Sequence, residues 1–206
     1  MRRVALLAAL LLAACGGGPH YAPLGPGTPV LAFGDSVTHG SGAAPGEDFP
    51  SRLAALSGWQ IANAGLPGDT AAAVERIAAA LAETRPRLVL IELGGNDFLQ
   101  RRPESAVKED LRRIVAAAAA AGATPVLIAV PRFSPVGAAL GLLADAPLYA
   151  ELATEAKIPL VKGVFAEVLG DSGLHADAIH PNAAGYRRMA EGIAAALAAE
   201  GLLARR

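Results

Sequence analysis

The residues with the clearest chemical potential are a serine near the start of the chain and an aspartate–histidine pair near its end. Ser36 lies in the segment GDSVTHG, residues 34–40, directly after an apolar run. Asp177 and His180 are three positions apart, so a single turn brings the carboxylate beside the imidazole. A hydroxyl is a poor nucleophile at neutral pH, so it needs an imidazole to take its proton and a carboxylate to orient that imidazole. The chain offers these three groups in the order Ser, Asp, His.

Each of these residues also has an ordinary structural interpretation. The tripeptide Gly-Asp-Ser is common and also caps helices, so it carries weight only together with other motifs. Taken singly, Asp177 fits a turn residue and His180 a surface histidine at a helix start, and Asn182 is a candidate N-cap for the last helix. His39 and His175 lie near the same motifs but have no carboxylate at a suitable spacing. We therefore expect both to be loop histidines.

Two segments rich in glycine and asparagine follow predicted strands. Residues 63–70 read NAGLPGDT and residues 94–97 read GGND. An acyl-transfer enzyme must stabilise an oxyanion, and suitable donors are backbone N–H groups in bare turns and a side-chain amide. The N–H groups of Ser36 and Gly68 and the amide of Asn96 are candidates for such a set. Alternatively, both segments are left-handed turns between strands and helices, with a helix cap at residue 69 or 70.

The elements that must position these residues alternate along the chain. Apolar β-rich runs predict strands at residues 30–33, 59–63, 88–93, 124–130 and 160–164. Apolar or alanine positions at helical spacing predict helices at residues 49–56, 70–84, 104–121, 147–156 and 182–203. This alternation indicates an α/β fold whose helices cover both faces of a parallel sheet. Right-handed crossovers wind such units into a three-layer α/β/α sandwich, with ligand sites at the carboxyl ends of the strands.

Composition limits the classes of function. A chain of 206 residues is long enough for one domain with a sizeable core. A formal net charge of -1 offers no broad basic face, so we predict no nucleic-acid partner. The sequence has no His-Glu-x-x-His motif, cysteine pair, dense carboxylate cluster or phosphate-binding loop. We therefore predict no metal and no cofactor.

The first residues indicate export. A basic start and a short apolar stretch predict a signal peptide over residues 1–14, followed by a Gly/Pro-rich tether over 15–28 and the domain over 29–206. Leu12-Ala13-Ala14-Cys15 resembles the lipobox of bacterial lipoproteins, and Cys15 is the only cysteine, which excludes an intrachain disulfide. We predict lipidation of Cys15 and membrane attachment at the periplasmic face of the envelope, on the outer membrane in a double-membraned bacterium. The alternative is an ordinary cleaved signal with an incidental cysteine.

Four motifs together carry a family resemblance. Gly34-Asp35-Ser36, the segment 63–70, the segment 94–97 and Asp-x-x-His-Pro at 177–181 match, in order, the four blocks of the GDSL or SGNH hydrolase superfamily. The match spans nearly all of the predicted domain and resembles most the small bacterial arylesterase/acyl-thioesterase/lysophospholipase branch. Val37 stands where the family name has Leu, at a packing position, so this departure puts little in doubt.

The resemblance implies a role for each matched residue. Ser36 would be the nucleophile, His180 the general base and Asp177 its orienting partner. The amide of Asn96 and the N–H of Gly68 would join the N–H of Ser36 in the oxyanion hole. The resemblance also implies a flavodoxin-like sandwich with five parallel strands in the order 2-1-3-4-5.

A glycine-bearing apolar loop at residues 131–143 lies at the predicted site end of the sheet. Exposed leucines are costly unless a ligand or membrane meets them, so this loop is a candidate acyl-binding wall. The predicted substrate-binding residues are Asp35, Phe133, Val136, Leu140 and Leu142. The alternative is a short helix packed on the core. An aromatic content of 4% disfavours a sugar-stacking cleft.

We therefore predict a serine esterase that hydrolyses carboxylic esters or thioesters through an acyl-Ser36 intermediate. Its partner is a small acyl ester or thioester, and the sequence implies no obligate protein partner. One alternative is a carbohydrate acetylesterase, because the same catalytic set accepts short acyl groups. Another is a non-catalytic lipoprotein that binds acylated envelope components.

Overall fold

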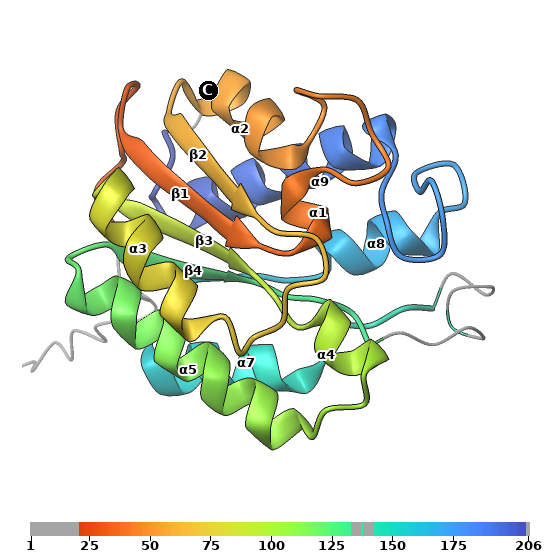
Figure 1. The fold of residues 1–206 in the computed structure, drawn as a ribbon. Coiled ribbons are helices and arrows are strands. Elements are labelled where there is room, and N and C mark those ends of the chain that lie inside the picture. Colours follow the sequence, from red (N-terminus) through yellow and green to blue (C-terminus); the bar gives the residue numbers. More distant parts are fainter. Residues whose placement is uncertain (1–20, 133–136, 138–141, 205–206) are drawn as a thin grey trace, which may run out of the picture.

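A five-stranded parallel sheet forms the centre of the molecule (Figure 1). The computed structural model describes residues 21–132, 137 and 142–204. The strands are β1 (Pro29–Gly34), β2 (Gln60–Gly65), β3 (Leu88–Glu92), β4 (Thr124–Ile128) and β5 (Leu160–Val161). They lie in the order β2-β1-β3-β4-β5, and every adjacent pair is parallel. The predicted fold class and strand order are confirmed.

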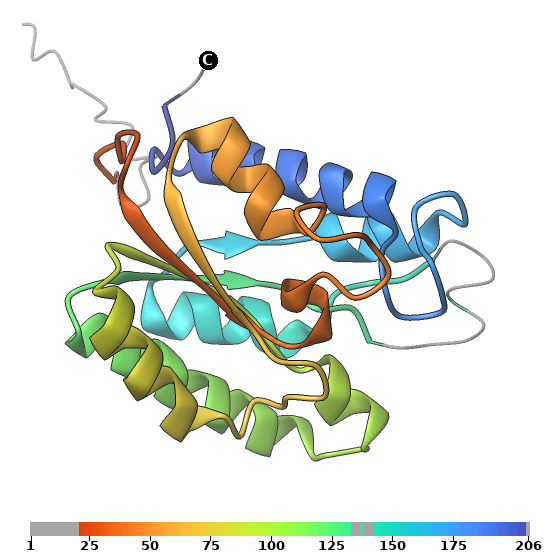
Figure 2. The ribbon, with the colours of Figure 1, turned by 45° about the horizontal axis from the view of Figure 1, so that its top comes forward.

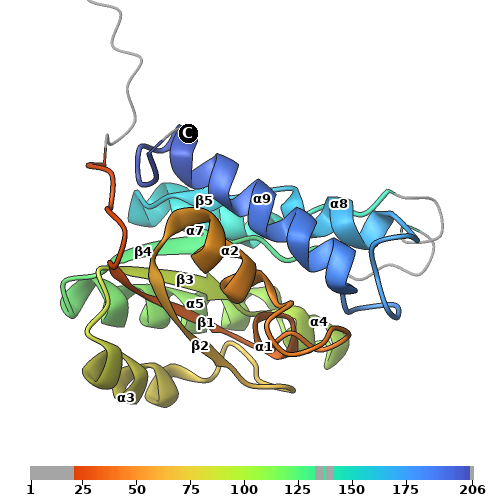
Figure 3. The same cartoon turned by 90° about the horizontal axis from the view of Figure 1, so that it is seen from above.

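Helices cover both faces of this sheet, as Figures 2 and 3 show. One layer consists of α2 (Phe49–Ser57), α8 (Val164–Gly170) and α9 (Ala183–Ala199). The other consists of α3 (Val74–Thr84), α5 (Glu104–Ala120) and α7 (Pro147–Ala156). Because both faces are covered, all five residues of β3 are buried, which explains why that strand is a continuous apolar run up to its last residue. Two short helices, α1 (Ser36–His39) and α4 (Gly95–Leu99), follow β1 and β3 at the carboxyl edge of the sheet.

The predicted helices agree with α2, α5 and α7 to within one residue, whereas α9 ends at Ala199 rather than residue 203, and the bounds of α3 and β5 also differ. α3 begins at Val74 rather than residue 70, because residues 71–73 form a turn and the N–H of Ala71 donates to Asp97 Oδ2 at 2.9 Å. The predicted strand 160–164 ends at Val161, because Gly163 takes a left-handed conformation (φ 78°) and Val164 starts α8. Short helices such as α1, α4 and α8 were not predicted, because each is too short to establish a helical period.

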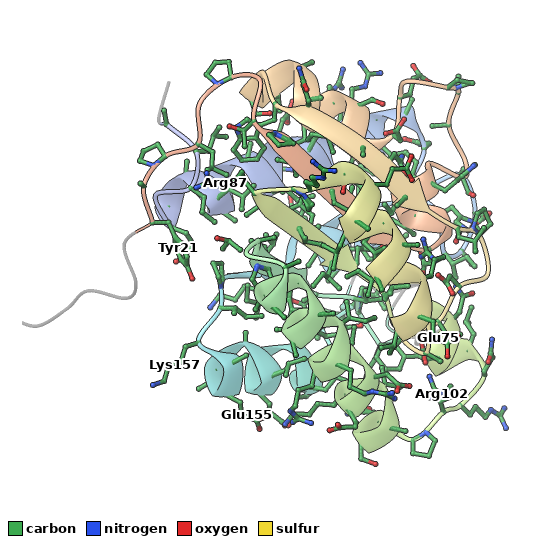
Figure 4. All side chains as sticks on the ribbon, turned by 60° about the vertical axis from the view of Figure 1, so that its left-hand side comes forward. Tyr21, Glu75, Arg87, Arg102, Glu155 and Lys157 are labelled. Atoms are coloured by element: carbon green, nitrogen blue, oxygen red, sulfur yellow. The ribbon has the colours of Figure 1, made fainter. Side chains whose placement is uncertain are left out.

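Residues 21–28, which belong to the predicted tether, pack against the domain. The N–H of Leu24 donates to Leu202 O at 2.9 Å, and Trp59 Nε1 donates to Leu24 O at 3.2 Å. Tyr21, labelled in Figure 4, is the first described residue and is partly buried against the core. The apolar side chains of Tyr21 and Leu24 find a surface near the end of α9, a contact that local composition did not reveal. The predicted signal peptide and Cys15 lie outside the described residues.

Within the described parts of the chain, no helix combines the length and the apolar character needed to cross a bilayer.

Candidate active site

Ser36, His180 and Asp177 form a continuous hydrogen-bonded relay. His180 Nε2 lies 3.0 Å from Ser36 Oγ, and His180 Nδ1 lies 2.8 Å from Asp177 Oδ2. An ionised carboxylate can only accept, so Nδ1 carries the ring hydrogen in the neutral imidazole and Nε2 turns its lone pair to the serine hydroxyl. The fold thus brings together three groups that the sequence analysis selected from opposite ends of the chain.

Asp177 is fixed as a carboxylate by the loop that carries the histidine. Its Oδ1 accepts from the N–H groups of Ile179 and His180, both at 2.9 Å. Partial burial raises the pKa of Asp177, but the hydrogen bond from the His180 ring and those two N–H groups outweigh it, so the pKa lies below its ordinary value. The carboxylate therefore stays ionised beside the imidazole at neutral pH.

The His180 loop is anchored to α9 and to the segment after α1. Asn182 is the N-cap of α9, as predicted, and its side chain accepts from the N–H of Gly185 at 3.0 Å. The N–H of Ala176 donates to His180 O at 2.8 Å, and Tyr186 Oη of α9 donates to Ser41 O at 2.7 Å. These bonds hold both sides of the Ser36–His180 contact against one long helix.

His39 and His175, the two alternative histidines, take no part in this relay. His39 is exposed at the end of α1, and the backbone of His175 pairs with Pro181 in an isolated bridge. Neither side chain makes a hydrogen bond to any residue that the structure describes.

Ser36 is the first residue of α1 and is separated from β1 by Asp35 alone. Asp35 caps this helix, because its Oδ1 accepts from the N–H of Val37 at 2.9 Å. The helix ends at Gly40, whose φ of 101° requires a residue without a side chain. The structural interpretation of Gly-Asp-Ser as a helix cap therefore holds for Asp35, while Ser36 itself is presented to the imidazole.

Asn96 borders the same pocket as Ser36 and His180. Its Nδ2 donates to Asp69 O at 2.7 Å and more weakly to Asp35 Oδ2 at 3.3 Å. Gly68 takes a left-handed conformation (φ 84°) in the loop after β2, but it is not among the residues that line this pocket. Ser36 and Asn96 therefore line the same pocket, whereas Gly68 lies in the loop after β2.

An apolar hollow of about 500 Å³, including its open mouth, extends from Ser36 and His180. Its apolar walls come from α4, the end of β4, the segment before α7, α8 and the His180 loop, and include Leu99, Val130, Leu143, Phe165, Leu169 and Ile179. A mostly apolar lining with a few polar groups is typical of small-molecule sites.

The predicted substrate-binding residues have different outcomes. Asp35 borders the pocket, although only 3% of its surface is exposed. Leu142 is 72% exposed and does not line the pocket, whereas its neighbour Leu143 does. Phe133, Val136 and Leu140 lie outside the described residues, so for them the acyl-wall and short-helix interpretations stay predictions.

Two ionic contacts that were not predicted, one at the fully buried Asp97 and one at the partly buried Asp69, hold the site loops together. Asp97 is fully buried, accepts from Arg102 and from the N–H of Ala71, and so joins α4 to the loop before α3. Arg102, which follows α4 (Figure 4), also donates to Asp110 at 2.7 Å. Asp97 belongs to the GGND block, so its motif was visible, but nothing in the sequence indicated its partners.

Arg76 of α3 makes the second contact. Its Nε donates to Asp69 Oδ2 at 2.8 Å, and its two terminal nitrogens donate to Ala64 O at 2.7 Å and Gly34 O at 3.1 Å. The guanidinium also lies 4.0 Å from the ring centroid of Phe33. One side chain thus ties the loop containing Gly68 to the end of the strand that delivers Ser36.

Among the described residues, no group of three histidine, cysteine, aspartate or glutamate side chains is arranged to hold a metal ion.

The parallel sandwich and the Ser–His–Asp relay at its carboxyl edge define a serine hydrolase that acts on ester bonds. The family model described as "GDSL-like Lipase/Acylhydrolase family" matches residues 32–188. The chain belongs to this family.

Comparison with characterised proteins agrees with this assignment. The chain is similar to "Esterase TesA" of Pseudomonas aeruginosa, with 32% identity over 80% of this chain and 85% of that protein. It is 33% identical to "Thioesterase 1/protease 1/lysophospholipase L1" of Escherichia coli K12, over 74% of this chain and 75% of that protein. The crystal structure of TesA superposes with a TM-score of 0.71 at 30% identity, covering 83% of this chain and 98% of that chain.

Removal of the Arg76 clamp tests how much the site loops depend on it. We expect Arg76→Met to lower the free energy of unfolding by about 1–3 kcal/mol, because Asp69 and two carbonyl groups lose their donors. Denaturant titration measures this. The matched control is Arg188→Met, which removes an exposed pair with Glu167 and should change stability by less than about 1 kcal/mol. Equal effects of the two substitutions would contradict the clamp.

Proposed function

We propose that this esterase forms an acyl-enzyme on Ser36, with His180 as general base and Asp177 as its orienting carboxylate. The observation that carries the proposal is the relay from Ser36 Oγ through the imidazole to an ionised carboxylate, at the mouth of an apolar hollow. This geometry supplies both a nucleophile with an adjacent base and a place for the acyl group.

Each step follows from these contacts. Ser36 Oγ attacks the carbonyl carbon of the ester while its proton passes to His180 Nε2, and Asp177 stabilises the resulting imidazolium. The N–H of Ser36, the amide of Asn96 and the N–H of Gly68 are proposed to stabilise the oxyanion. The tetrahedral intermediate then collapses, and the leaving alcohol or thiol takes the proton from His180. A water molecule, deprotonated by His180, releases the acid and restores Ser36.

We further propose that the substrates are esters and thioesters of hydrocarbon acyl chains. The apolar walls of the hollow support this, because they offer burial to a chain but few groups to bind a sugar. The names of the two curated relatives, an esterase and a thioesterase/lysophospholipase, support the same class. The acetylesterase alternative requires only a small acyl site. The non-catalytic alternative does not explain why Ser36, His180 and Asp177 are hydrogen-bonded to one another.

For the N-terminal segment we propose export, with residues 1–14 as the signal peptide and Cys15 as the lipidated first residue of the mature protein. The support is the sequence pattern alone. We expect the intact mass of protein purified from a bacterial envelope to equal residues 15–206 plus acyl groups. Residues 15–206 without added acyl groups would point to simple signal cleavage instead.

The nucleophile is tested by Ser36→Ala. Removing the hydroxyl should lower kcat/KM for aryl acyl esters by a factor on the order of 10⁶ and abolish labelling by a fluorophosphonate. Ser105→Ala, at an exposed position of α5, is the control and should retain both properties. Labelling that persists in the Ser36→Ala protein would place the nucleophile elsewhere.

Chain-length preference separates the acyl-chain proposal from an acetylesterase. Each buried methylene contributes about 0.8 kcal/mol, or roughly fourfold, so kcat/KM should rise from acetyl to butyryl to decanoyl aryl esters. Leu169→Phe narrows the hollow and should reduce activity on decanoyl esters more than on acetyl esters. Leu56→Ala, on the exposed side of α2, serves as the control. A steep preference for acetyl esters would favour the carbohydrate alternative.

A further inference from the structure

Two carboxyl groups lie next to each other beneath Ser36. Asp35 directly follows β1 and Glu92 is the last residue of β3, and these parallel strands are paired with Gly34 opposite Glu92. The side chains of Asp35 and Glu92 are almost fully buried, with 3% and 1% of the residue surface exposed. Within the described residues, neither forms an ion pair with a lysine or arginine. A pair of buried acids without a cation requires an explanation, because burying an unpaired charge is costly.

The hydrogen bonds of Glu92 indicate where a proton lies. Its Oε2 accepts from Thr38 Oγ1 at 2.9 Å, while its Oε1 is buried without a partner among the described hydrogen bonds. Asp35 follows the residue that lies opposite Glu92 in the sheet, and the charge of Asp35 raises the pKa of Glu92. Two ionised carboxylates buried side by side without a cation would be costly, and a proton on one of them removes that cost.

Glu92 is the group that holds this proton. Burial and then the charge of Asp35 raise the pKa of Glu92 well above its ordinary value. Burial also raises the pKa of Asp35, to about 6, but the hydrogen bond from the Val37 N–H and the nearby His180 favour its ionised form. These interactions favour a protonated Glu92 beside an ionised Asp35.

Asp35 connects Glu92 to the groups that are proposed to take part in the reaction. Its Oδ1 caps the helix that begins at Ser36, and its Oδ2 accepts from Asn96 Nδ2. Gly34 allows the close packing that this requires, because a Cβ there would lie 2.0 Å from Thr38 Oγ1. Hydrogen bonds thus link Thr38 to Glu92 and Asn96 to Asp35, and a proton on Glu92 can join these two pairs.

We propose that Glu92 is a positioning residue that acts in its protonated form, holding Asp35 so that the Ser36 turn and the Asn96 amide keep their places. Its effect on turnover rests on the proposed roles of Ser36 and Asn96. The protonation of Glu92 does not depend on those roles, and it can be measured in the absence of substrate.

The surroundings of Glu92 determine how the pair responds to pH. Glu92 interacts electrostatically with Tyr149 of α7 and Tyr186 of α9, and Asp35 interacts with His180 and Asp69. These neighbours are neutral hydroxyls or acids, apart from the imidazole. At alkaline pH hydroxide removes the proton from Glu92, which leaves two neighbouring carboxylates that repel each other.

The sign of the effect on stability follows from the raised pKa. A glutamate in the unfolded chain loses its proton near pH 4.3, whereas folded Glu92 keeps it to a higher pH. The stability associated with this proton is complete below the unfolded pKa and is lost progressively as the pH rises through the folded pKa. A side chain that cannot ionise at this position escapes the loss.

Three variants test the proposal. Glu92→Gln retains a donor for Asp35 and an acceptor for Thr38, so it imitates the protonated acid and should retain the activity of wild type at pH 7. Its Tm relative to wild type should increase from pH 4 to pH 9. Glu92→Leu lacks the donor and should lower kcat by about 10- to 100-fold with a smaller change in KM. Glu151→Gln, an exposed glutamate of α7, is the matched control and should follow wild type throughout.

Difference infrared spectroscopy supplies a direct readout. Wild type should show the carbonyl stretch of a protonated buried carboxyl at pH 7, and Glu92→Gln should lack it. The proposal is overturned if that band is absent, if the Tm difference does not change with pH, or if folded Glu92→Gln is inactive while wild type is active. If wild type itself hydrolyses no ester, the proposed function fails, and the band and the Tm difference still decide the state of Glu92. If Glu92→Leu does not fold, the infrared band and the Tm difference of Glu92→Gln still decide whether Glu92 is protonated.

Discussion

The contact between Ser36 Oγ and His180 Nε2 depends on the parallel arrangement of the strands. The two residues are 144 positions apart, and a 3.0 Å contact between them requires that the chain return repeatedly to the same edge of the sheet. Each right-handed crossover does this, because it carries the chain back over a helix and starts the next strand in the same direction. The strand-end loops therefore gather at one edge, and α9 fixes the His180 loop beside them through the Asn182 cap and Tyr186. Everything the site can do follows from this convergence.

The gathering of the strand-end loops at one edge does not by itself hold these polar loops in place above an apolar sheet. Two acids meet this need, the fully buried Asp97 and the partly buried Asp69, and each binds groups from another segment. Asp97 joins the loop before α3 to Arg102, and Asp69 receives Arg76, whose other donors reach the ends of β1 and β2. Because a buried charge is costly unless it is paired, each such contact has a large effect if one partner is lost. The described residues that line the hollow do not include Asp97, Arg102, Asp69 or Arg76, and the surface of the hollow is mostly apolar.

The sequence identified the parts of this site that are local, and the fold to which they belong. Ser36, Asp177 and His180 stand in short motifs, and alternating strands and helices are a repeated pattern, so both could be predicted. Arg76 could not, because an arginine on a helix face has many possible partners and only the folded strand ends select among them. The sequence shows Glu92 only as the last residue of a predicted strand. Its neighbour across the sheet could not be predicted, because it depends on the register of β1 and β3. What the sequence left out is therefore the set of interactions between motifs.

The charge state beneath the site bears on the chemistry above it. The oxyanion is proposed to form beside Asn96, whose amide already touches the Asp35 carboxylate. A second negative charge on Glu92 would raise the energy of that oxyanion, since charges in a poorly solvated interior interact strongly. It would stabilise the imidazolium of His180 as well, but Asp177 already does so by direct contact. A neutral Glu92 can therefore hold its neighbours by hydrogen bonds. It adds no negative charge near the position where the oxyanion forms.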